Sequence, residues 1–440
     1  MGSTLINTPS TEYIYEPPAR ERVSLLIGLV VLFVLGAVTV TYLPGWSIAV
    51  KVLGWLLALA AVVVSFRGGL RVTPEVAMYF AWVAWALTGL FGAFSAEAFW
   101  LAWFSVLQMA GLVLIISTFI SNRKGLSICL GTFIVGGAVL GAYSILTGEF
   151  AQAEAMLEHE AGRVAGLAQN ANTFGWQMVL VTVALAYFWM MPSKWPLARA
   201  VILIAGMLGT GAATILSGSR MGIIGFGVFY VAWFWFCYRK LFMRRVGVTI
   251  AVILFAGVGT YLFANYLVSS GAAGRLVAIA DYARGAGDEG GGVAIRVQLL
   301  QKAGEIFLQH PLTGVGLGNF GFHGGGEMLA AHSQYGTIAA ETGLPGVLLY
   351  FGLMVVLWWR GSRLAKYSQD PVVRRIGGLS QAFLLTVFVT NWANMITWEK
   401  ATWIVLAGFV GYTHTVWGQL RLAPGPVAGR SSDGVALVST

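Results

Sequence analysis

Arg220 stands out in this apolar chain because a guanidinium group can bind an anion. It lies in the segment SGSRMG, residues 217–222, between two long apolar stretches and far in sequence from any acidic residue. An arginine held at a membrane surface costs a few kcal/mol unless it is paired or hydrated. Guanidinium groups bind phosphate oxygens in a bidentate manner, so Arg220 is a candidate phosphate ligand. The alternative is an interfacial arginine that reaches water and lipid headgroups.

Two further arginines could extend such an anion site. Arg163 lies in a segment that leads into an apolar stretch and also contains Asn170 and Asn172. The asparagines are typical helix caps, or they could bind sugar hydroxyls beside Arg163. Arg296 belongs to a predicted amphipathic helix over Val293–His310. The alternative to anion binding is that Arg296 lies on the solvent-exposed face of this helix.

His332 could move a proton. It lies in the segment AHSQY, where a Gly-rich loop is predicted to become a helix. An ordinary histidine pKa of about 6.5 suits a general base, although a lone histidine is more often structural. The histidine spacing does not fit a metal site, and neither an HExxH nor a paired CxxC motif occurs. We therefore expect no metal and no cofactor.

The glycine-rich run from His310 to Phe320 superficially resembles a phosphate-binding loop. It lacks the Lys-Ser/Thr that follows in a P-loop, so it predicts a tight turn after the amphipathic helix. Cys129 and Cys237 lie in apolar stretches, which indicates small core residues instead of a disulfide.

The elements that position these residues are predicted to be membrane helices. Hydrophobic residues make up 58% of the chain and charged residues 10%, too few charges to cover a soluble protein of this size. A spanning helix needs about 20 apolar residues. Twelve stretches approach that length: Val23–Tyr42, Ser47–Phe66, Val72–Phe94, Phe99–Ser121, Gly125–Thr147, Asn172–Met191, Leu197–Leu216, Met221–Tyr238, Val246–Val268, Leu344–Trp359, Ile376–Ile396 and Ala401–Gln419.

The distribution of basic residues supports this topology. If the N-terminus is cytoplasmic, most of the 27 Lys and Arg residues fall in segments on the cytoplasmic side. Lys51 lies within a stretch, and the outer exceptions are Arg163, Arg220, Arg275, Arg284, Arg296, Lys302 and Lys400. The net charge of +9 is therefore a topology signal, and we expect no nucleic-acid partner.

The sequence thus predicts an all-α polytopic membrane protein with about 12 transmembrane helices and both termini cytoplasmic. Its expected parts are an N-terminal tail (residues 1–22), transmembrane helices 1–9 (23–268), a large periplasmic loop subdomain (269–343), transmembrane helices 10–12 (344–419) and a C-terminal tail (420–440).

Several short segments together resemble the O-antigen ligase/polymerase superfamily of bacterial envelope glycosyltransferases. They are Gly162–Asn172, Ser217–Gly222, Arg296 with His310–Gly316, and Ala331–Ser333 with Glu341–Gly346. The resemblance implies a GT-C-like fold in the bacterial inner membrane with a periplasmic active site. It also implies inverting, metal-independent transfer of a glycan from undecaprenyl diphosphate to an acceptor hydroxyl, such as a lipid A-core sugar. Arg220 would bind the diphosphate and His332 would be catalytic, with Arg163 and Arg296 as further arginines.

Other functions fit parts of this pattern. An O-antigen or exopolysaccharide polymerase, or a protein O-oligosaccharyltransferase, would use the same donor with another acceptor. A transporter or flippase of lipid-linked sugars would also have many spans, but such proteins commonly carry internal repeats and charges at mid-membrane. We see no clear repeat between the two halves, and the unusual residues gather at the outer surface, which favours an enzyme.

Overall fold

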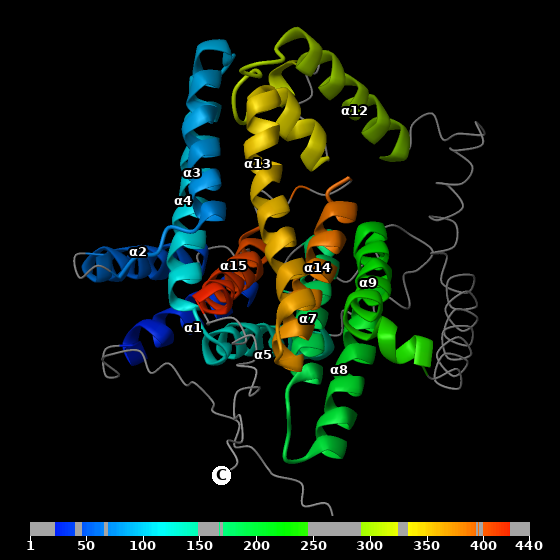
Figure 1. The fold of residues 1–440 in the computed structure, drawn as a ribbon. Helices are drawn as coiled ribbons and strands as arrows, with labels where there is room; N and C mark the ends of the chain where they lie inside the picture. Colours follow the sequence, from blue (N-terminus) through cyan, green and yellow to red (C-terminus); the bar gives the residue numbers. More distant parts are fainter. Residues whose placement is uncertain are drawn as a thin grey trace, which may run out of the picture.

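The computed structural model describes residues 23–39, 46–65, 69–147, 167, 170–244, 292–323, 333–392, 395 and 399–422. Every regular element in these residues is helical (Figure 1), which confirms the all-α prediction. The elements are α1 (Val23–Thr39), α2 (Trp46–Ser65), α3 (Pro74–Ala86), η1 (Leu87–Gly92), α4 (Ala96–Phe119), α5 (Arg123–Leu146), α7 (Ala171–Met190), α8 (Pro196–Leu216), α9 (Arg220–Arg244), α12 (Gly292–Gln309), η3 (Phe320–His323), α13 (Gln334–Tyr367), α14 (Pro371–Thr390) and α15 (Lys400–Leu422).

The chain is a polytopic membrane protein. Within the described ranges, eight helices are long and apolar enough to cross a membrane: α3 with η1, α4, α5, α7, α8, α9, α13 and α14. They coincide with eight of the twelve predicted stretches. Helices α1 and α2 contain shorter apolar runs, Ile27–Thr39 and Ile48–Val63. Helix α15 covers the twelfth stretch, whereas the ninth, Val246–Val268, lies outside the described residues.

Polar residues at the helix starts explain where several helices begin. Thr73 accepts a hydrogen bond from the N–H of Val76, and Pro74 follows as the first residue of α3. Ser95 and Asn122 cap α4 and α5 in the same way. Each cap satisfies an N–H group that would otherwise lack a partner in the apolar bundle.

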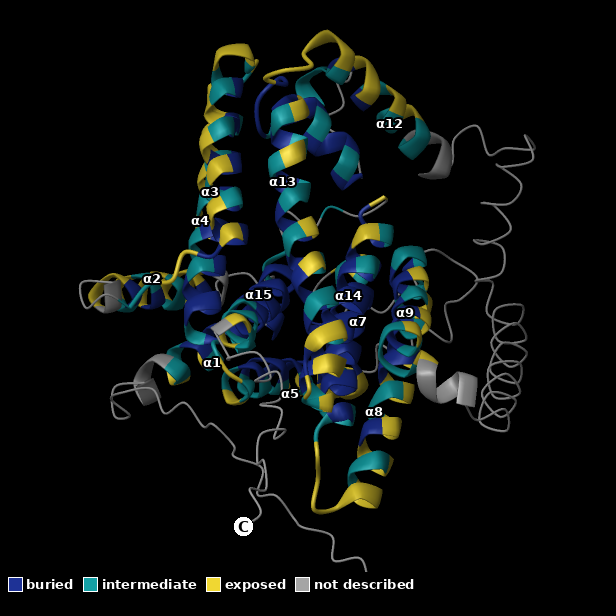
Figure 2. Cartoon of the chain, viewed as in Figure 1, coloured by how far each residue is buried: buried dark blue, intermediate teal, exposed yellow. Residues whose placement is uncertain are grey.

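Helix α7 is the centre of the bundle and is buried along most of its length (Figure 2). It contacts α5, α8, α9, α14 and α15. Helices α13 and α14 cross closely because Gly361 and Gly377 face each other, and a Cβ built on Gly377 would lie 2.6 Å from the carbonyl oxygen of Gly361. Small residues at such crossings are typical of membrane helix pairs.

A buried ion pair ties α3 to α13. Nη1 of Arg360 lies 2.6 and 2.7 Å from the two carboxylate oxygens of Glu75, and both residues are buried. Because removing one partner would leave an uncompensated charge inside the bundle, this pair fixes how the two helices pack.

The amphipathic helix predicted over Val293–His310 is confirmed as α12, which lies across the start of α13 (Figure 1). Its buried residues Ala303 and Ile306 pack with Val315, Phe320 and Ala340. Leu308 is exposed on the same helix.

The glycine run after α12 is a tight turn, as predicted. Gly314, Gly316 and Gly318 all have positive φ values, of 68°, 89° and 71°, a region that side chains disfavour. A Cβ on Gly316 would lie 2.7 Å from the carbonyl oxygen of Gly89, so the run packs backbone against backbone. Asn319 fastens it to the start of α4 by accepting from the N–H of Ser95 at 2.7 Å. The glycines therefore serve packing.

Helix α13 consists of two helical parts joined by a kink at Gly343, whose φ is 64°. Pro345 follows the kink and cannot donate a backbone hydrogen bond. The first part begins at Gln334 and lies beneath α12, and the second part runs through the bundle. The predicted boundary between the large loop and the tenth span falls at this kink.

Candidate functional site

Arg220 is the first residue of α9 and follows the predicted short turn between α8 and α9. Ser219 precedes it and caps the helix, since its Oγ accepts from the N–H of Gly222 at 3.1 Å. Ser217 ends α8 by donating its hydroxyl to the carbonyl oxygen of Thr214 at 2.6 Å, and Gly218 between the serines has a φ of 61°. The serines are buried and Arg220 is half-buried, so the turn holds the arginine in a defined place.

This turn packs on the first turns of α7 and, through α9, on the end of α14. A Cβ on Gly175 of α7 would lie 2.7 Å from Oγ of Ser217. A Cβ on Gly225 of α9 would lie 2.9 Å from Cγ2 of Thr390, the last residue of α14. Helices α7 and α9 therefore begin where α14 ends.

Helix α13 begins at the same place. Its cap is Ser333, whose Oγ accepts from the N–H of Gly336, and the N–H of Gln334 donates to the carbonyl oxygen of Asn391 at 2.9 Å. The hydroxyl of Tyr335 donates to the carbonyl oxygen of Phe388 on α14. His332, the predicted base, comes directly before Ser333 in the sequence and lies outside the described residues.

The start of α15 completes this end of the bundle. The hydroxyl of Thr173 on α7 donates to Oε1 of Glu399 at 3.3 Å, and Nε1 of Trp176 donates to Oγ1 of Thr402 at 2.7 Å. We call this end, where α7, α9, α13 and α15 begin and α14 ends, the Arg220 end. Four helices direct the positive ends of their dipoles to this end of the bundle, a setting that favours an anion.

The asparagines before α7 divide between the two roles expected of them. Asn170 is a helix cap, because its Oδ1 accepts from the N–H groups of Asn172 at 2.8 Å and Thr173 at 3.3 Å. Asn172 is exposed in the first turn of α7, and its role in sugar binding stays a prediction. Arg163 lies outside the described residues. Arg296 is half-buried on α12, which packs on the first part of α13 through Ala303 and Ile306.

Asn391, directly after α14, is a buried residue that the sequence did not single out. Its side chain is 0% exposed, and within the described part of the chain neither amide atom has a hydrogen-bond partner. A buried amide without a partner costs free energy, so such a group is often a ligand contact. The sequence alone cannot distinguish a ligand-binding asparagine at the end of an apolar stretch from one that caps a helix.

An apolar cavity of about 410 Å³ opens beside the Arg220 end, between α1, α2 and α4. Its lining is apolar except for Gln108, Lys51 and Lys400, and Lys400 is the first residue of α15. The two ammonium groups are close enough to repel each other. The sequence alone marks Lys51 as a functional candidate, because it is an ionisable residue within an apolar stretch. Its closeness to Lys400 is visible only in the fold.

Two other histidines, which the sequence predicts to be on the outer side, lie together beyond α12. The ring centres of His310 and His323 are 6.5 Å apart. Burial lowers the pKa of His323, and the nearby His310 and Lys302 lower it further. Across the described ranges, no group of three or more His, Cys, Asp or Glu residues could hold a metal ion.

Part of the chain that forms this site matches a known protein family. No curated protein matches the chain. Residues 204–351 match the family model described as O-antigen ligase, a range that includes Arg220, the turn before it, α12 and the start of α13. The family implies ligase or polymerase activity of the glycosyltransferase kind. The match over this segment confirms the resemblance to the O-antigen ligase family that the short motifs predicted.

Proposed function

We propose that this protein is an O-antigen ligase-type glycosyltransferase of the bacterial inner membrane. It transfers a glycan from undecaprenyl diphosphate to an acceptor hydroxyl on the periplasmic side, and a lipid A-core sugar is the acceptor of a ligase. The observation that carries the proposal is that the family-matched segment contributes both the Arg220 turn and the start of α13 to one end of the bundle.

The chemistry is a single inverting displacement. The acceptor oxygen attacks the anomeric carbon, the bond from that carbon to the diphosphate oxygen breaks, and its electron pair leaves with the diphosphate. His332 takes the acceptor proton, while Arg220 binds the leaving diphosphate where negative charge develops. Arg163 and Arg296 are proposed as further anion contacts, and Asn172 and Asn170 as sugar contacts.

The apolar cavity supports a lipid-linked donor. A polyprenyl chain needs an apolar groove, and its diphosphate needs cations at the groove's polar end. Lys51 and Lys400 are cations among apolar side chains, and Lys400 adjoins Glu399, which contacts the first turn of α7 at the Arg220 end. An anion between the two ammonium groups would relieve their repulsion.

Loss of transfer in a His332→Ala variant tests the proposal. We expect release of undecaprenyl diphosphate from a purified glycan donor, with acceptor present, to fall by about 10²–10⁴-fold, the usual contribution of a general base. His310→Ala is the matched control, since His310 is an exposed outer histidine with no role in the proposed step. Full transfer by His332→Ala would remove the base assignment. If wild-type protein moves the donor across vesicles and releases no diphosphate, the chain is a transporter.

The acceptor is tested separately. Purified lipid A-core, a second carrier-linked repeat unit and an acceptor peptide would be offered with the same donor. Transfer to lipid A-core is expected for a ligase; transfer only to the repeat unit or only to the peptide would identify a polymerase or a protein glycosyltransferase.

A further inference from the structure

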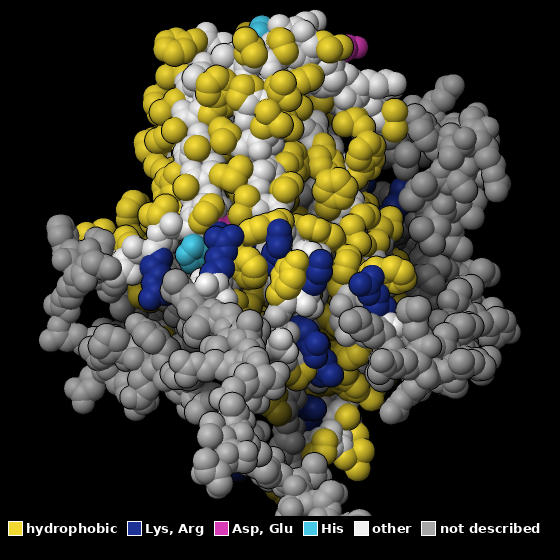
Figure 3. Space-filling view, viewed as in Figure 1, with side chains coloured by type: hydrophobic (Ala, Val, Ile, Leu, Met, Phe, Trp, Pro, Cys, Tyr) yellow, Lys and Arg dark blue, Asp and Glu magenta, His cyan; other side chains and the backbone are white. Residues whose placement is uncertain are grey.

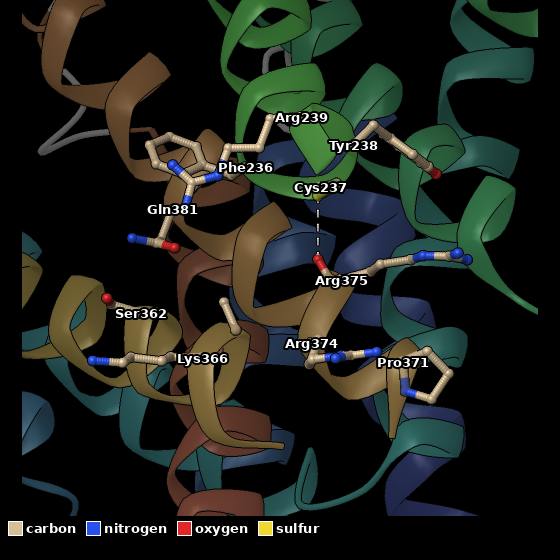
Figure 4. Close-up of a pocket in the computed structure, with 11 residues that line it drawn as sticks. Phe236, Cys237, Tyr238, Arg239, Ser362, Lys366, Pro371, Arg374, Arg375 and Gln381 are labelled. Atoms are coloured by element: carbon tan, nitrogen blue, oxygen red, sulfur yellow. Dashed lines mark hydrogen bonds between the residues drawn. The ribbon is translucent and has the colours of Figure 1, made fainter. Parts of the chain in front are cut away.

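A second cavity lies at the opposite end of the bundle from Arg220, and its lining is strongly basic. It has a volume of about 540 Å³ and lies between α9, α13 and α14 (Figure 4). The α9 residues that line it begin at Phe236, about 24 Å along the helix from Arg220. Four cations line it, from all three helices: Arg239, Lys366, Arg374 and Arg375. No acidic residue is among the lining residues in the described part of the chain.

The nearby carboxylates are already engaged. Asp370 precedes α14 and lies 2.6 Å from Nη2 of Arg123. Its other oxygen accepts from the N–H of Val372 at 2.7 Å. Glu75 is paired with Arg360 inside the bundle. Neither acid lines the cavity, and each is paired with an arginine that does not line it either.

Two of the four cations occupy positions that their own helix disfavours. Arg374 and Arg375 lie in the first turns of α14, where the helix dipole is positive and favours an anion. In addition, Nη1 of Arg199 is buried and has no hydrogen-bond partner within the described ranges. Arg199 lies close enough to Tyr238, a lining residue, to act on it electrostatically. An anion here would satisfy several groups at once.

The surface beside the cavity indicates the rest of the ligand. Val231, Trp235 and Arg239 follow one another at four-residue spacing, so they share one face of α9. Val231 is 73% and Trp235 59% exposed, and the guanidinium of Arg239 lies 5.8 Å from the ring centre of Trp235. Figure 3 shows basic side chains in a band below a broad apolar surface. An apolar path that ends at a cluster of cations fits acyl chains with a phosphate headgroup.

We propose that this basic cavity between α9, α13 and α14 binds the phosphate headgroup of an anionic phospholipid, with the acyl chains along the Val231–Trp235 face. The positive-inside rule explains why cations gather at this end of the bundle. It does not explain a cavity that three helices line with cations and that no carboxylate of the described ranges lines. Basic pockets between membrane helices bind such headgroups in other proteins.

Lipid binding by the full-length protein in detergent tests this proposal. Delipidated protein would be titrated with phosphatidylglycerol, with phosphatidylcholine and with inorganic phosphate, and bound lipid would be counted by native mass spectrometry. We expect selective binding of phosphatidylglycerol, reduced about tenfold or more in the double variant Arg374→Gln, Arg375→Gln. The double variant Arg239→Gln, Lys366→Gln removes the cations of the other two helices and should act alike.

The matched control is the double variant Arg363→Gln, Arg421→Gln. Both control residues are cations at the same end, and they lie over the ring of Trp359 instead of lining the cavity. We expect its lipid binding to stay within about twofold of wild type. Equal retention of phosphatidylglycerol by all three variants would overturn the proposal. Equally tight binding of inorganic phosphate would also overturn it, because the cavity would then be a site for free anions. Unchanged melting temperatures in phosphatidylcholine would show that the variants are folded.

Discussion

The apolar cavity beside the Arg220 end and the basic cavity at the opposite end of the bundle use cations in different ways. The cavity beside the Arg220 end measures about 410 Å³ and places Lys51 and Lys400 among apolar side chains. The cavity at the other end measures about 540 Å³ and is lined by four cations from three helices. The first suits a long apolar chain with a charged end, and the second suits a headgroup whose chains lie outside on the helix surface.

The arginines of the two ion pairs that join helices line neither cavity. Arg360 is buried against Glu75, and Arg123 is paired with Asp370. These pairs hold helices together. The four cations that line the basic cavity form no ion pair with a carboxylate among the described residues, whereas Lys400 of the apolar cavity lies close enough to Glu399 for that carboxylate to offset part of its charge. A cation that is paired with a carboxylate thus has a structural role, and a cation without such a pair is a candidate for ligand binding. In a membrane bundle, this difference in partners is more informative than the position of the cation in the sequence.

The largest effect that separates the two ends is expected for Arg220→Lys. Lysine keeps the positive charge but loses the fork that binds a diphosphate in two places. We expect glycan transfer to fall about 10²-fold, as when one transition-state donor is removed, while binding of phosphatidylglycerol is unchanged. Turnover and lipid binding would be measured on the same preparation.

The control for Arg220→Lys is Arg375→Lys, which changes the same group in the other cavity and should leave transfer intact. Unchanged transfer and donor affinity in Arg220→Lys would make this arginine an interfacial anchor. A loss of phosphatidylglycerol binding in Arg220→Lys would show that the two ends are not independent.

A smaller effect is expected when the apolar cavity is filled. Gly111 lines it, and a Cβ there would meet no atom within 4 Å, so Gly111→Leu adds a side chain at the cavity wall with no clash at its Cβ. We expect the KM for the polyprenyl-linked donor to rise about tenfold with turnover little changed, because only binding of the chain is lost. A donor with a short prenyl chain should be less affected.

Gly141→Leu is the matched control for the filled cavity. Gly141 also has open space at its Cβ, but it lies on α5 outside the lining. Equal donor KM in both variants would remove the polyprenyl chain from this cavity.

These expectations also show what the sequence could predict. Periodicity and caps predicted α12, the glycine turn and the short α8–α9 turn, because each depends on residues close together in the chain. The family segments identified Arg220 from its neighbours. The meeting of α13 with α14 through Gln334 and Asn391, and of Lys51 with Lys400, depends on contacts between residues far apart in sequence. No local pattern encodes such contacts, so Asn391 and the lysine pair were found only in the fold.

The smallest effect is expected for Asp370→Asn, which tests whether the carboxylate nearest the basic cavity is separate from it. Burial raises the pKa of Asp370, but the N–H of Val372 and the guanidinium of Arg123 outweigh burial and hold the pKa below its ordinary value. A lowered pKa means that the charged form adds stability above about pH 4 and that this stability is lost as the pH falls further. Asparagine still caps α14 but cannot form the half-exposed ion pair, so we expect a loss of about 1 kcal/mol or less at pH 7. Thermal melts at pH 7 and pH 4 would measure this loss, which should shrink at the lower pH.

Because Asp370 does not line the cavity, binding of phosphatidylglycerol should not change. A clear gain in lipid binding would mean that this carboxylate competes with the headgroup for the same arginines, and the separation between paired and ligand-binding cations would then fail at this end of the bundle.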